Sequence, residues 1–148
     1  MKLAALTFLL LGATMAACDT EDLTPKKVPV EVRQTLLNIF PNASNIEWER
    51  QGQNYEAEFY LTAVDHAALL HASGNLLMYK HQVTNQSLPE AVKTTIARKY
   101  PNYSVSQAER LVIGTETLYQ VEVSKNDQSE WLVLSITGEE RPHLAYWD

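Results

Sequence analysis

Cysteine, glycine and basic residues are all scarce in this chain of 148 residues. The only cysteine, Cys18, has no partner in the chain for a disulfide, and one thiol cannot build a thiolate metal site. The five glycines form no glycine-rich phosphate loop. No second long apolar run follows residue 13, so the remainder holds no apolar stretch of about 20 residues that could span a membrane. The fold must therefore be held together by its hydrophobic core alone.

The charge balance is acidic, with 18 Asp and Glu against 12 Lys and Arg. Removal of Lys2 with the predicted signal peptide leaves 11 basic residues and a formal charge of −7 on the mature chain, residues 18–148. Nucleic acid and anionic lipid both require a basic face, so neither is a predicted ligand. The acidic residues are scattered along the chain, which is typical of a solvated surface. A basic partner is compatible with this composition.

The first 17 residues have the layout of a secretory signal peptide: Lys2, an apolar stretch over residues 3–13, and then small residues. The motif Met15-Ala16-Ala17-Cys18 resembles a lipobox, in which the cysteine is lipidated on sulfur and becomes the new N-terminus. We therefore predict a lipid anchor at Cys18, because two or more acyl chains hold a protein stably at a membrane. Ordinary cleavage near Ala17, which would leave a free thiol, is the alternative.

The residues after Cys18 bear on where the anchored protein is located. Asp19, Glu21 and Asp22 resemble the surface-export signal of Bacteroidetes lipoproteins, whereas Asp directly after the lipidated cysteine in enteric bacteria would suggest retention in the inner membrane. We expect a cell-envelope protein anchored to the outer membrane, on its periplasmic side or at the cell surface. Residues 18–27 are expected to form a lipidated tether, and the lipid is the only membrane contact predicted.

The rest of the chain is an internal repeat. A shift of sixty residues aligns Val28-Pro29 with Leu88-Pro89, and Phe40-Pro41-Asn42 with Tyr100-Pro101-Asn102. Apolar residues at helical spacing lie between these motifs, and proline is favoured in the first turn of a helix. Each copy, 28–87 and 88–148, is thus predicted to open with a helix of about three turns.

A shift of sixty-four residues aligns the segments that follow, Tyr55–Phe59 with Tyr119–Val123, and Ser73-Gly74 with Thr137-Gly138. Alternation of apolar and polar residues predicts strands with one buried face, and glycine between apolar runs predicts hairpin turns. The predicted fold class is α+β, with two tandem repeats of one helix followed by about four antiparallel strands. The predicted strands are Asn45–Arg50, Asn54–Leu61, Asp65–Ala72, Leu76–Gln82, Ser104–Ile113, Glu116–Ser124, Glu130–Ile136 and Glu140–Tyr146, the last an edge strand because it contains Pro142.

Parity divides the strand residues between two faces of the sheet. The side chains expected toward the helices are Tyr55, Ala57, Phe59, Leu61, Leu70, Tyr119, Val121, Val123 and Leu134. A turn at Ser73-Gly74 further predicts that Leu69 pairs with Met78, His71 with Leu76 and His66 with His81. Several apolar residues then lie on the face that no predicted helix covers, and such a surface needs an explanation.

These features resemble the PepSY-like family, also described as putative beta-lactamase-inhibitor-like proteins. The resemblance rests on the lipobox and on two helix-plus-sheet units that open with Leu/Val-Pro and end their helix in an aromatic-Pro-Asn step. Ala72-Ser73-Gly74-Asn75 and Ile136-Thr137-Gly138-Glu139 depart from the family, whose members often carry an acidic residue or lysine around the hairpin glycine. The resemblance implies a noncatalytic, envelope-located binding or inhibitory module with a concave sheet surface.

The predicted function is the binding of a protein or peptide ligand through the uncovered sheet face. An apolar centre with a charged rim is the usual anatomy of a protein interface. Trp131 is the aromatic residue selected as a ligand contact, although exposed aromatic rings also suit stacking on sugars. The candidate ligand-binding residues are Tyr60, Leu69, Met78, Trp131, Val133, Glu56, Glu58 and Glu122. A structural, self-associating envelope module is the alternative.

Catalysis and cofactors are not predicted. Glu56 and Glu58 share a strand face, where exposed carboxylates keep ordinary acidity, and no nucleophile lies beside a base. His66 and His81 would face each other across a hairpin, close enough to share a Zn²⁺ or Cu²⁺ ion. A stable site needs three or four ligands, and only Asp65 is a candidate third. A small metal-binding protein or metal-assisted hydrolase is thus a second alternative.

Overall fold

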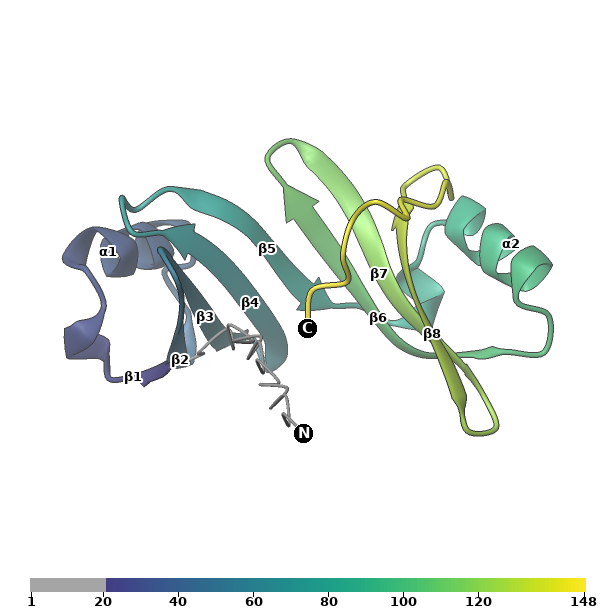
Figure 1. Ribbon diagram of the computed structural model, residues 1–148, viewed down its shortest axis with the longest axis horizontal. Helices are drawn as coiled ribbons and strands as arrows, with labels where there is room; N and C mark the ends of the chain where they lie inside the picture. Colours follow the sequence, from purple (N-terminus) through teal and green to yellow (C-terminus); the bar gives the residue numbers. More distant parts are fainter. Residues whose placement is uncertain (1–20) are drawn as a thin grey trace, which may run out of the picture.

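The computed structural model describes residues 21–148, and the predicted signal peptide and Cys18 lie outside the described residues. The described residues contain two α-helices and eight strands. The strands form one antiparallel sheet in which they are ordered as in the chain, from β1 to β8 (Figure 1). The predicted α+β class is confirmed. The elements are β1 (Glu21–Leu23), the 3-10 helix η1 (Pro25–Lys27), α1 (Val30–Ile39), β2 (Ser44–Gln51), β3 (Asn54–Leu61), β4 (Val64–His71), β5 (Leu76–Gln82), η2 (Asn85–Ser87), α2 (Glu90–Lys99), β6 (Ser104–Ile113), β7 (Glu116–Lys125) and β8 (Gln128–Ser135).

Both helices begin directly after a proline and end at an aromatic residue. Pro29 precedes α1 and Pro89 precedes α2, with φ of −52° and −55°, near the value that the proline ring imposes. At the other end Phe40 and Tyr100 leave the helical conformation, and the amide of each donates to a carbonyl one turn back, at 2.8 Å. The aligned Pro and aromatic-Pro-Asn motifs therefore set the helix bounds in both copies.

Each helix covers its own half of the sheet, and both lie on the same face. The first core packs α1 against β2, β3 and β4, and the second packs α2 against β6, β7 and β8. The predicted inward parity is confirmed, since Ala57, Leu70, Val121 and Leu134 are fully buried in these cores. The buried members of the first core are Val28, Val32, Leu36, Phe40, Trp48, Tyr55, Ala57, Phe59, Ala68 and Leu70; those of the second are Leu88, Val92, Ile96, Ala108, Tyr119, Val121, Val123, Leu132 and Leu134.

The second repeat contains three strands instead of four, so the strand predicted at Glu140–Tyr146 is wrong. Beyond β8 a single bridge, Leu134 with Glu140, is the last ladder contact of the described chain. Pro142 has no amide hydrogen to donate to a ladder. The chain instead leaves the sheet edge and ends beside β5 and β6, between the two halves of the sheet (Figure 1). We call residues 140–148 the C-terminal segment.

The segment before α1 is more ordered than the expected tether. Residues Glu21–Leu23 form β1, which pairs with β2 through Glu21 with Arg50 and Leu23 with Trp48. The 3-10 helix η1 follows directly. A strand of three residues carries too little pattern to be recognised in a sequence, and it forms here because β2 offers an unpaired edge.

The predicted β4–β5 hairpin is confirmed in most of its register. His66 pairs with His81 and Leu69 with Met78. A bulge then shifts the register, so that Leu70 pairs with Leu76 and the predicted pairing of His71 with Leu76 is wrong. The amide of His71 donates instead to the carbonyl of Asn75 at 2.9 Å.

Candidate functional site

The face of the sheet opposite the helices carries the candidate ligand-binding residues. Residues paired across neighbouring strands have side chains on the same face. Glu56 pairs with Leu69, which pairs with Met78, and on the second half Glu122 pairs with Trp131. Tyr60 and Glu58 share the parity of Glu56, and Val133 shares that of Trp131. We call this surface the helix-free face.

The structure shows that these residues are not equally exposed. Trp131 is 56% exposed and Tyr60 is 41% exposed, so both are open to a partner. Leu69 is 8% and Val133 6% exposed, and Met78 is partly buried. The expectation that Glu56 is an exposed carboxylate is wrong, since it is 5% exposed. The helix-free face is therefore open at the two ends and covered at its centre.

The C-terminal segment covers the apolar centre. Leu144 and Trp147 pack against a small third core that lies on the helix-free face. Its buried members are Leu111, Leu118 and Val133, with Met78 and Ile113 partly buried beside them. These residues come from strands β5 to β8, so the segment crosses the junction between the repeats. The sequence placed Met78 and Val133 on this face correctly, but it did not reveal what covers them.

Gln120 binds the main chain of Trp147 at two points. Its Nε2 donates to the Trp147 carbonyl at 2.8 Å, and its Oε1 accepts from the Trp147 amide at 2.8 Å. The Gln120 side chain is fully buried. A buried polar side chain requires hydrogen-bond partners, and this one finds them in a single residue of the C-terminal segment and in Glu109.

Lys80 and Glu109 complete the polar contacts around that residue. The Lys80 Nζ donates to the Trp147 carbonyl at 2.6 Å and lies 3.4 Å from the Glu109 carboxylate. It also lies 5.1 Å from the centre of the Trp147 ring, within the range of a cation–π interaction. The Glu109 carboxylate in turn accepts from Gln120 Nε2 at 3.0 Å. Lys80 and Glu109 are 7% and 6% exposed, and a buried charge of either sign is tolerated because it is paired. We call Lys80, Glu109 and Gln120 the buried polar trio.

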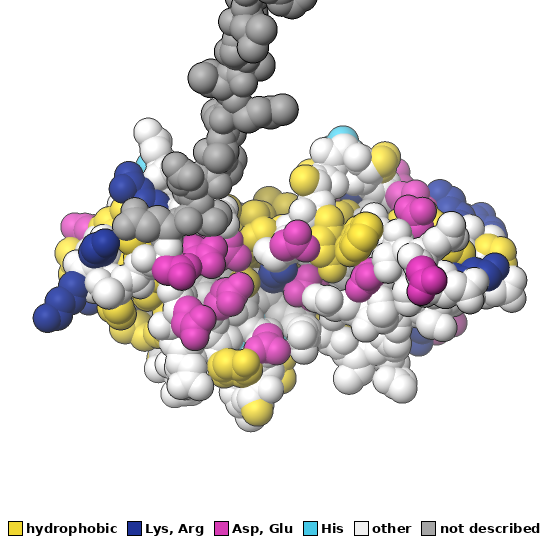
Figure 2. Space-filling view, turned by 60° about the horizontal axis from the view of Figure 1, so that its bottom comes forward, with side chains coloured by type: hydrophobic (Ala, Val, Ile, Leu, Met, Phe, Trp, Pro, Cys, Tyr) yellow, Lys and Arg dark blue, Asp and Glu magenta, His cyan; other side chains and the backbone are white. Residues whose placement is uncertain are grey.

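Acidic residues surround the covered centre on the side of the first repeat. Asp22 pairs with Glu49, Glu49 with Glu56, and Glu47 with Glu58, which places five carboxylates on the helix-free face of β1, β2 and β3. Figure 2 shows Asp and Glu side chains gathered on one face of this half. Burial raises the pKa of Glu56, against the opposing influence of Trp147 and Lys80, and Glu58 and Glu49 raise it further.

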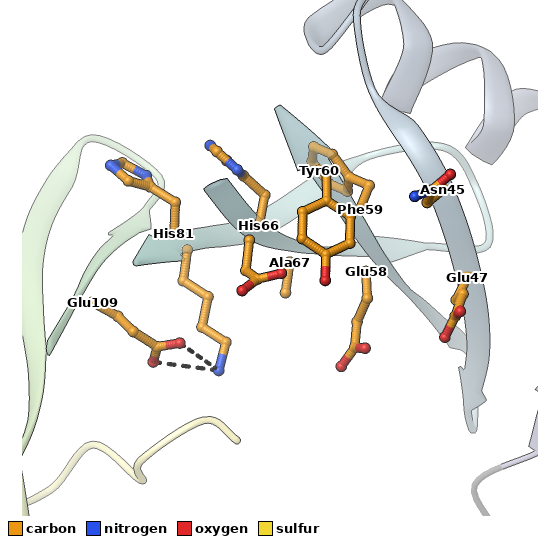
Figure 3. A pocket seen from close by; sticks show the side chains of 11 residues that line it. Asn45, Glu47, Glu58, Phe59, Tyr60, His66, Ala67, His81 and Glu109 are labelled. Carbon is orange, nitrogen blue, oxygen red and sulfur yellow. Dashed lines mark hydrogen bonds and ion pairs between the residues drawn. The ribbon is translucent and has the colours of Figure 1, made fainter. Parts of the chain in front are cut away.

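A pocket of about 240 Å³ opens beside this acidic surface (Figure 3). Glu47 and Glu58 lie on one side of it in Figure 3 and Glu109 on the other. Lys80, which is ion-paired with Glu109, also lines the pocket. Figure 3 also shows Tyr60 over the pocket. Its complete lining is Asn45, Glu47, Glu58, Phe59, Tyr60, Asp65, His66, Ala67, Lys80, His81 and Glu109. Four carboxylates against one ion-paired lysine make the pocket suited to a cationic group.

His66 and His81 stack with ring centroids 5.0 Å apart. His66 Nδ1 lies 2.9 Å from the Val64 carbonyl, while His81 Nδ1 is buried and has no hydrogen-bond partner within the described part of the chain. Burial lowers the pKa of His81, and the charges of His66 and Arg110 lower it further.

The third metal ligand considered for this pair is not in place. Asp65 pairs with Tyr60, whereas His66 pairs with Phe59, so Asp65 and His66 lie on opposite faces of β4. Residues 21–148 contain no group of three or more His, Cys, Asp or Glu side chains arranged to hold a metal ion. The metal alternative therefore lacks the ligand count that a stable site requires.

Sequence reasoning missed the buried polar trio and its contact with Trp147. A signal was available for one member: Gln120 is a polar residue within a strand, and its two neighbours, Tyr119 and Val121, are apolar. Trp147 follows a segment whose proline removes it from a central ladder. Neither signal says which residue meets which, because the contacts join positions 27 to 67 residues apart.

The comparisons with known proteins match the repeat. A family model described as "Putative beta-lactamase-inhibitor-like, PepSY-like" matches residues 14–78 and again residues 63–137. The chain belongs to this family, which fits a noncatalytic protein. No curated protein matches the chain.

Several solved structures from Bacteroides share the fold. A DUF2874 family protein from Bacteroides uniformis is 20% identical, with 76% of this chain and 85% of that chain covered and a TM-score of 0.70. A protein from Bacteroides eggerthii described as a putative periplasmic protein is 19% identical, with 76% and 85% covered and a TM-score of 0.71. A BLIP-like protein from Bacteroides fragilis is 26% identical, with 76% and 83% covered and a TM-score of 0.66.

Over residues 21–148, neither helix has the length and apolar character needed to cross a bilayer. Each contains 10 residues, which corresponds to roughly 15 Å, about half of the hydrocarbon thickness.

Proposed function

We propose that this protein is a noncatalytic envelope protein that binds a protein or peptide ligand through the helix-free face. The observation that supports it most is that the face already holds a stretch of peptide, the C-terminal segment. The buried polar trio binds the main chain of Trp147, and the third core receives its ring. Main-chain hydrogen bonds combined with a side-chain pocket are a general mode of peptide recognition.

The open ends of the face have the composition of a binding surface. Trp131 and Tyr60 are exposed aromatic residues, a type that is enriched at interfaces. Glu47 and Glu58 line the pocket beside Tyr60, and Glu49 lies on the same face of β2, so these carboxylates favour a partner with basic groups. The net charge of −6 for the whole chain points in the same direction.

A matched pair of variants tests the face. Trp131 and Ile136 are both 56% exposed, but Trp131 lies on the helix-free face of β8, whereas Ile136 lies in the turn that follows β8. Envelope proteins captured by the wild-type chain should be lost with Trp131→Ala and retained with Ile136→Ala. Charge reversal at Glu58, which is exposed, should weaken capture, and the loss should be larger at low salt than at high salt. Equal capture by all variants would rule out the helix-free face as the binding surface.

The lipid anchor at Cys18 is part of the proposed function. It would place the folded part at the outer membrane, with the residues between Cys18 and β1 as its link. The structural relative from Bacteroides eggerthii is described as a putative periplasmic protein, which agrees with the envelope location proposed for this chain.

Self-association is the second candidate function. The strand β8 is an edge strand of eight residues, and it carries the exposed Trp131. An exposed edge can pair with the edge of another chain. Sedimentation of the protein distinguishes the two functions: a dimer that Trp131→Glu dissociates would favour self-association.

A further inference from the structure

The site on the helix-free face that is formed by the buried polar trio and the third core is called the groove here. We propose that the C-terminal segment occupies this groove in cis, and that the partner is an extended peptide segment with an aromatic residue followed by a basic one. This inference rests on the proposed function and names the class of partner for the same face. The C-terminal segment shows which groups the groove accepts. Its acidic residue Asp148 lies near other carboxylates, and a partner in trans would differ from it by carrying a basic residue there.

The groove recognises a peptide group without regard to sequence. Gln120 pairs with both the amide and the carbonyl of Trp147, and Lys80 adds a second donor to that carbonyl. Any residue except proline could supply these two main-chain atoms. The trio is nine-tenths buried or more with the C-terminal segment in place, and Glu109 holds both Gln120 and Lys80 through contacts that do not involve Trp147.

The position of the bound side chain selects an aromatic ring. The Trp147 ring lies on Lys80 and packs with Leu111, Leu118 and Val133. Its indole N–H is buried and acts on the Glu56 carboxylate, whose pKa it lowers against the larger effect of burial. The tryptophan thus contributes apolar area and the ring face that Lys80 meets.

The electrostatic surroundings disfavour the last residue of the C-terminal segment. Asp148 follows Trp147, whose carbonyl oxygen lies 2.6 Å from Lys80 Nζ, and that nitrogen lies 3.4 Å from the Glu109 carboxylate. Burial raises the pKa of the neighbouring Tyr146, and Glu109, Asp148 and Glu122 raise it further. Asp148 therefore brings a negative charge close to the carboxylate of Glu109. Like charges close together repel, and a lysine or arginine at this position would instead be attracted.

The experiment uses the full chain purified in detergent and fluorescent peptides with the sequence of residues 140–148, capped at both ends. The wild-type chain should bind the peptide weakly, because its own segment competes at an effective concentration on the order of millimolar. Trp147→Ala in the protein should strengthen peptide binding about tenfold or more, because loss of the ring weakens the competing segment. In the peptide, Trp147→Ala should abolish the gain, and Asp148→Lys should strengthen binding about threefold at low salt, with little gain at high salt. Absence of peptide binding to a folded Trp147→Ala protein would overturn the proposal.

Hydrogen exchange of the wild-type chain provides a second test that needs no variant. If the C-terminal segment opens by itself, the Trp147 amide exchanges much faster than the core amides of β7. Exchange of the Trp147 amide only through global unfolding would make the segment an integral part of the fold and overturn the proposal. The proposed function would still stand in that case if Trp131→Ala loses the captured partners. A different outcome is that the peptide binds while Trp131→Ala captures the same partners as the wild type. That result would support the groove and would refute the proposal that the whole helix-free face binds the ligand.

Discussion

The side chain of Gln120 and the main chain of Trp147 form a closed pair of hydrogen bonds, both 2.8 Å long, across 27 positions of sequence. This pair attaches the C-terminal segment to the centre of the sheet. Gln120 also donates to Glu109 at 3.0 Å, so its removal affects both the segment and the charged part of the buried polar trio.

Replacement of Gln120 should release the C-terminal segment. Gln120→Leu keeps a similar volume but leaves the Trp147 amide without its acceptor, and we expect the free energy of unfolding to fall by about 1–3 kcal/mol. Gln107→Leu is the matched control, since Gln107 lies on the same sheet but is exposed. Urea unfolding of both variants measures the difference. A Gln120→Leu protein as stable as the control would contradict the importance of this pair.

The buried ion pair should be costly to break from one side only. Lys80→Met leaves the Glu109 carboxylate buried without its cation, and we expect a loss of about 3–5 kcal/mol in unfolding free energy. The double variant Lys80→Met with Glu109→Leu should recover most of that loss, because no unpaired charge remains. Lys93→Met is a suitable control, because its 3.1 Å pair with Glu90 is exposed and exposed pairs contribute about 0–1 kcal/mol. Denaturant titrations that show equal losses for the single and double variants would refute this reading of the pair.

Two glycines with positive φ should differ in their tolerance of alanine. Gly138 has φ +78°, and an added Cβ would clash with the carbonyl oxygen of Ala91 in α2. Gly52 has φ +63°, and nothing lies within 4 Å of its added Cβ. Gly52→Ala should therefore cost about 1 kcal/mol for backbone strain alone. Gly138→Ala should cost clearly more, because α2 has to move away from the hairpin. Thermal unfolding measures both, and similar melting temperatures would show that the hairpin does not press on the helix.

His81 should make stability depend on pH in the mildly acidic range. Burial lowers the pKa of His81 in the folded state, whereas the unfolded chain has the ordinary value of about 6.5. The unfolded state therefore binds more protons as the pH falls through that value, and the free energy of unfolding decreases. Above it, His81 is neutral in both states and the effect vanishes.

A comparison of variants isolates this contribution. Between pH 7.5 and 5.5 the melting temperature of the wild type should fall more than that of His81→Gln. Glu56 acts in the opposite direction, because burial raises its pKa, but it is present in both proteins. His143→Gln, at an exposed position, should behave like the wild type. Parallel pH profiles for the wild type and His81→Gln would exclude the effect.

If Cys18 is lipidated, replacing it by serine should change the compartment in which the protein is found. The wild-type chain should take up labelled fatty acid and fractionate with membranes, because each buried methylene contributes about 0.8 kcal/mol. Cys18→Ser, if it is still processed, should lose the label and the membrane association. Retention of the variant in the membrane fraction would show that something other than the lipid holds the protein.

The sequence by itself determined the parts of the structure that local physics controls. Pro29 and Pro89 set helix starts in both copies, and alternation over residues 55–59 and 119–123 assigned the buried faces correctly. The pairing of His66 with His81 followed from one turn at Ser73-Gly74. These features depend on near neighbours in the chain, so a repeat and a period are enough to predict them.

Only the tertiary structure decided what covers the helix-free face. Residues 140–146 align with the β5 strand at the shift of sixty-four residues, yet the main chain of Trp147 gains three hydrogen bonds and its ring gains an apolar site. The hydrogen-bond partners come from β5 and β7, and nothing in the local pattern of the segment refers to them. Residues 140–148 could either continue the ladder beside β8 or dock on the helix-free face. The assembled sheet decides between the two, because the free energy of burying polar groups depends on the partners that surround them.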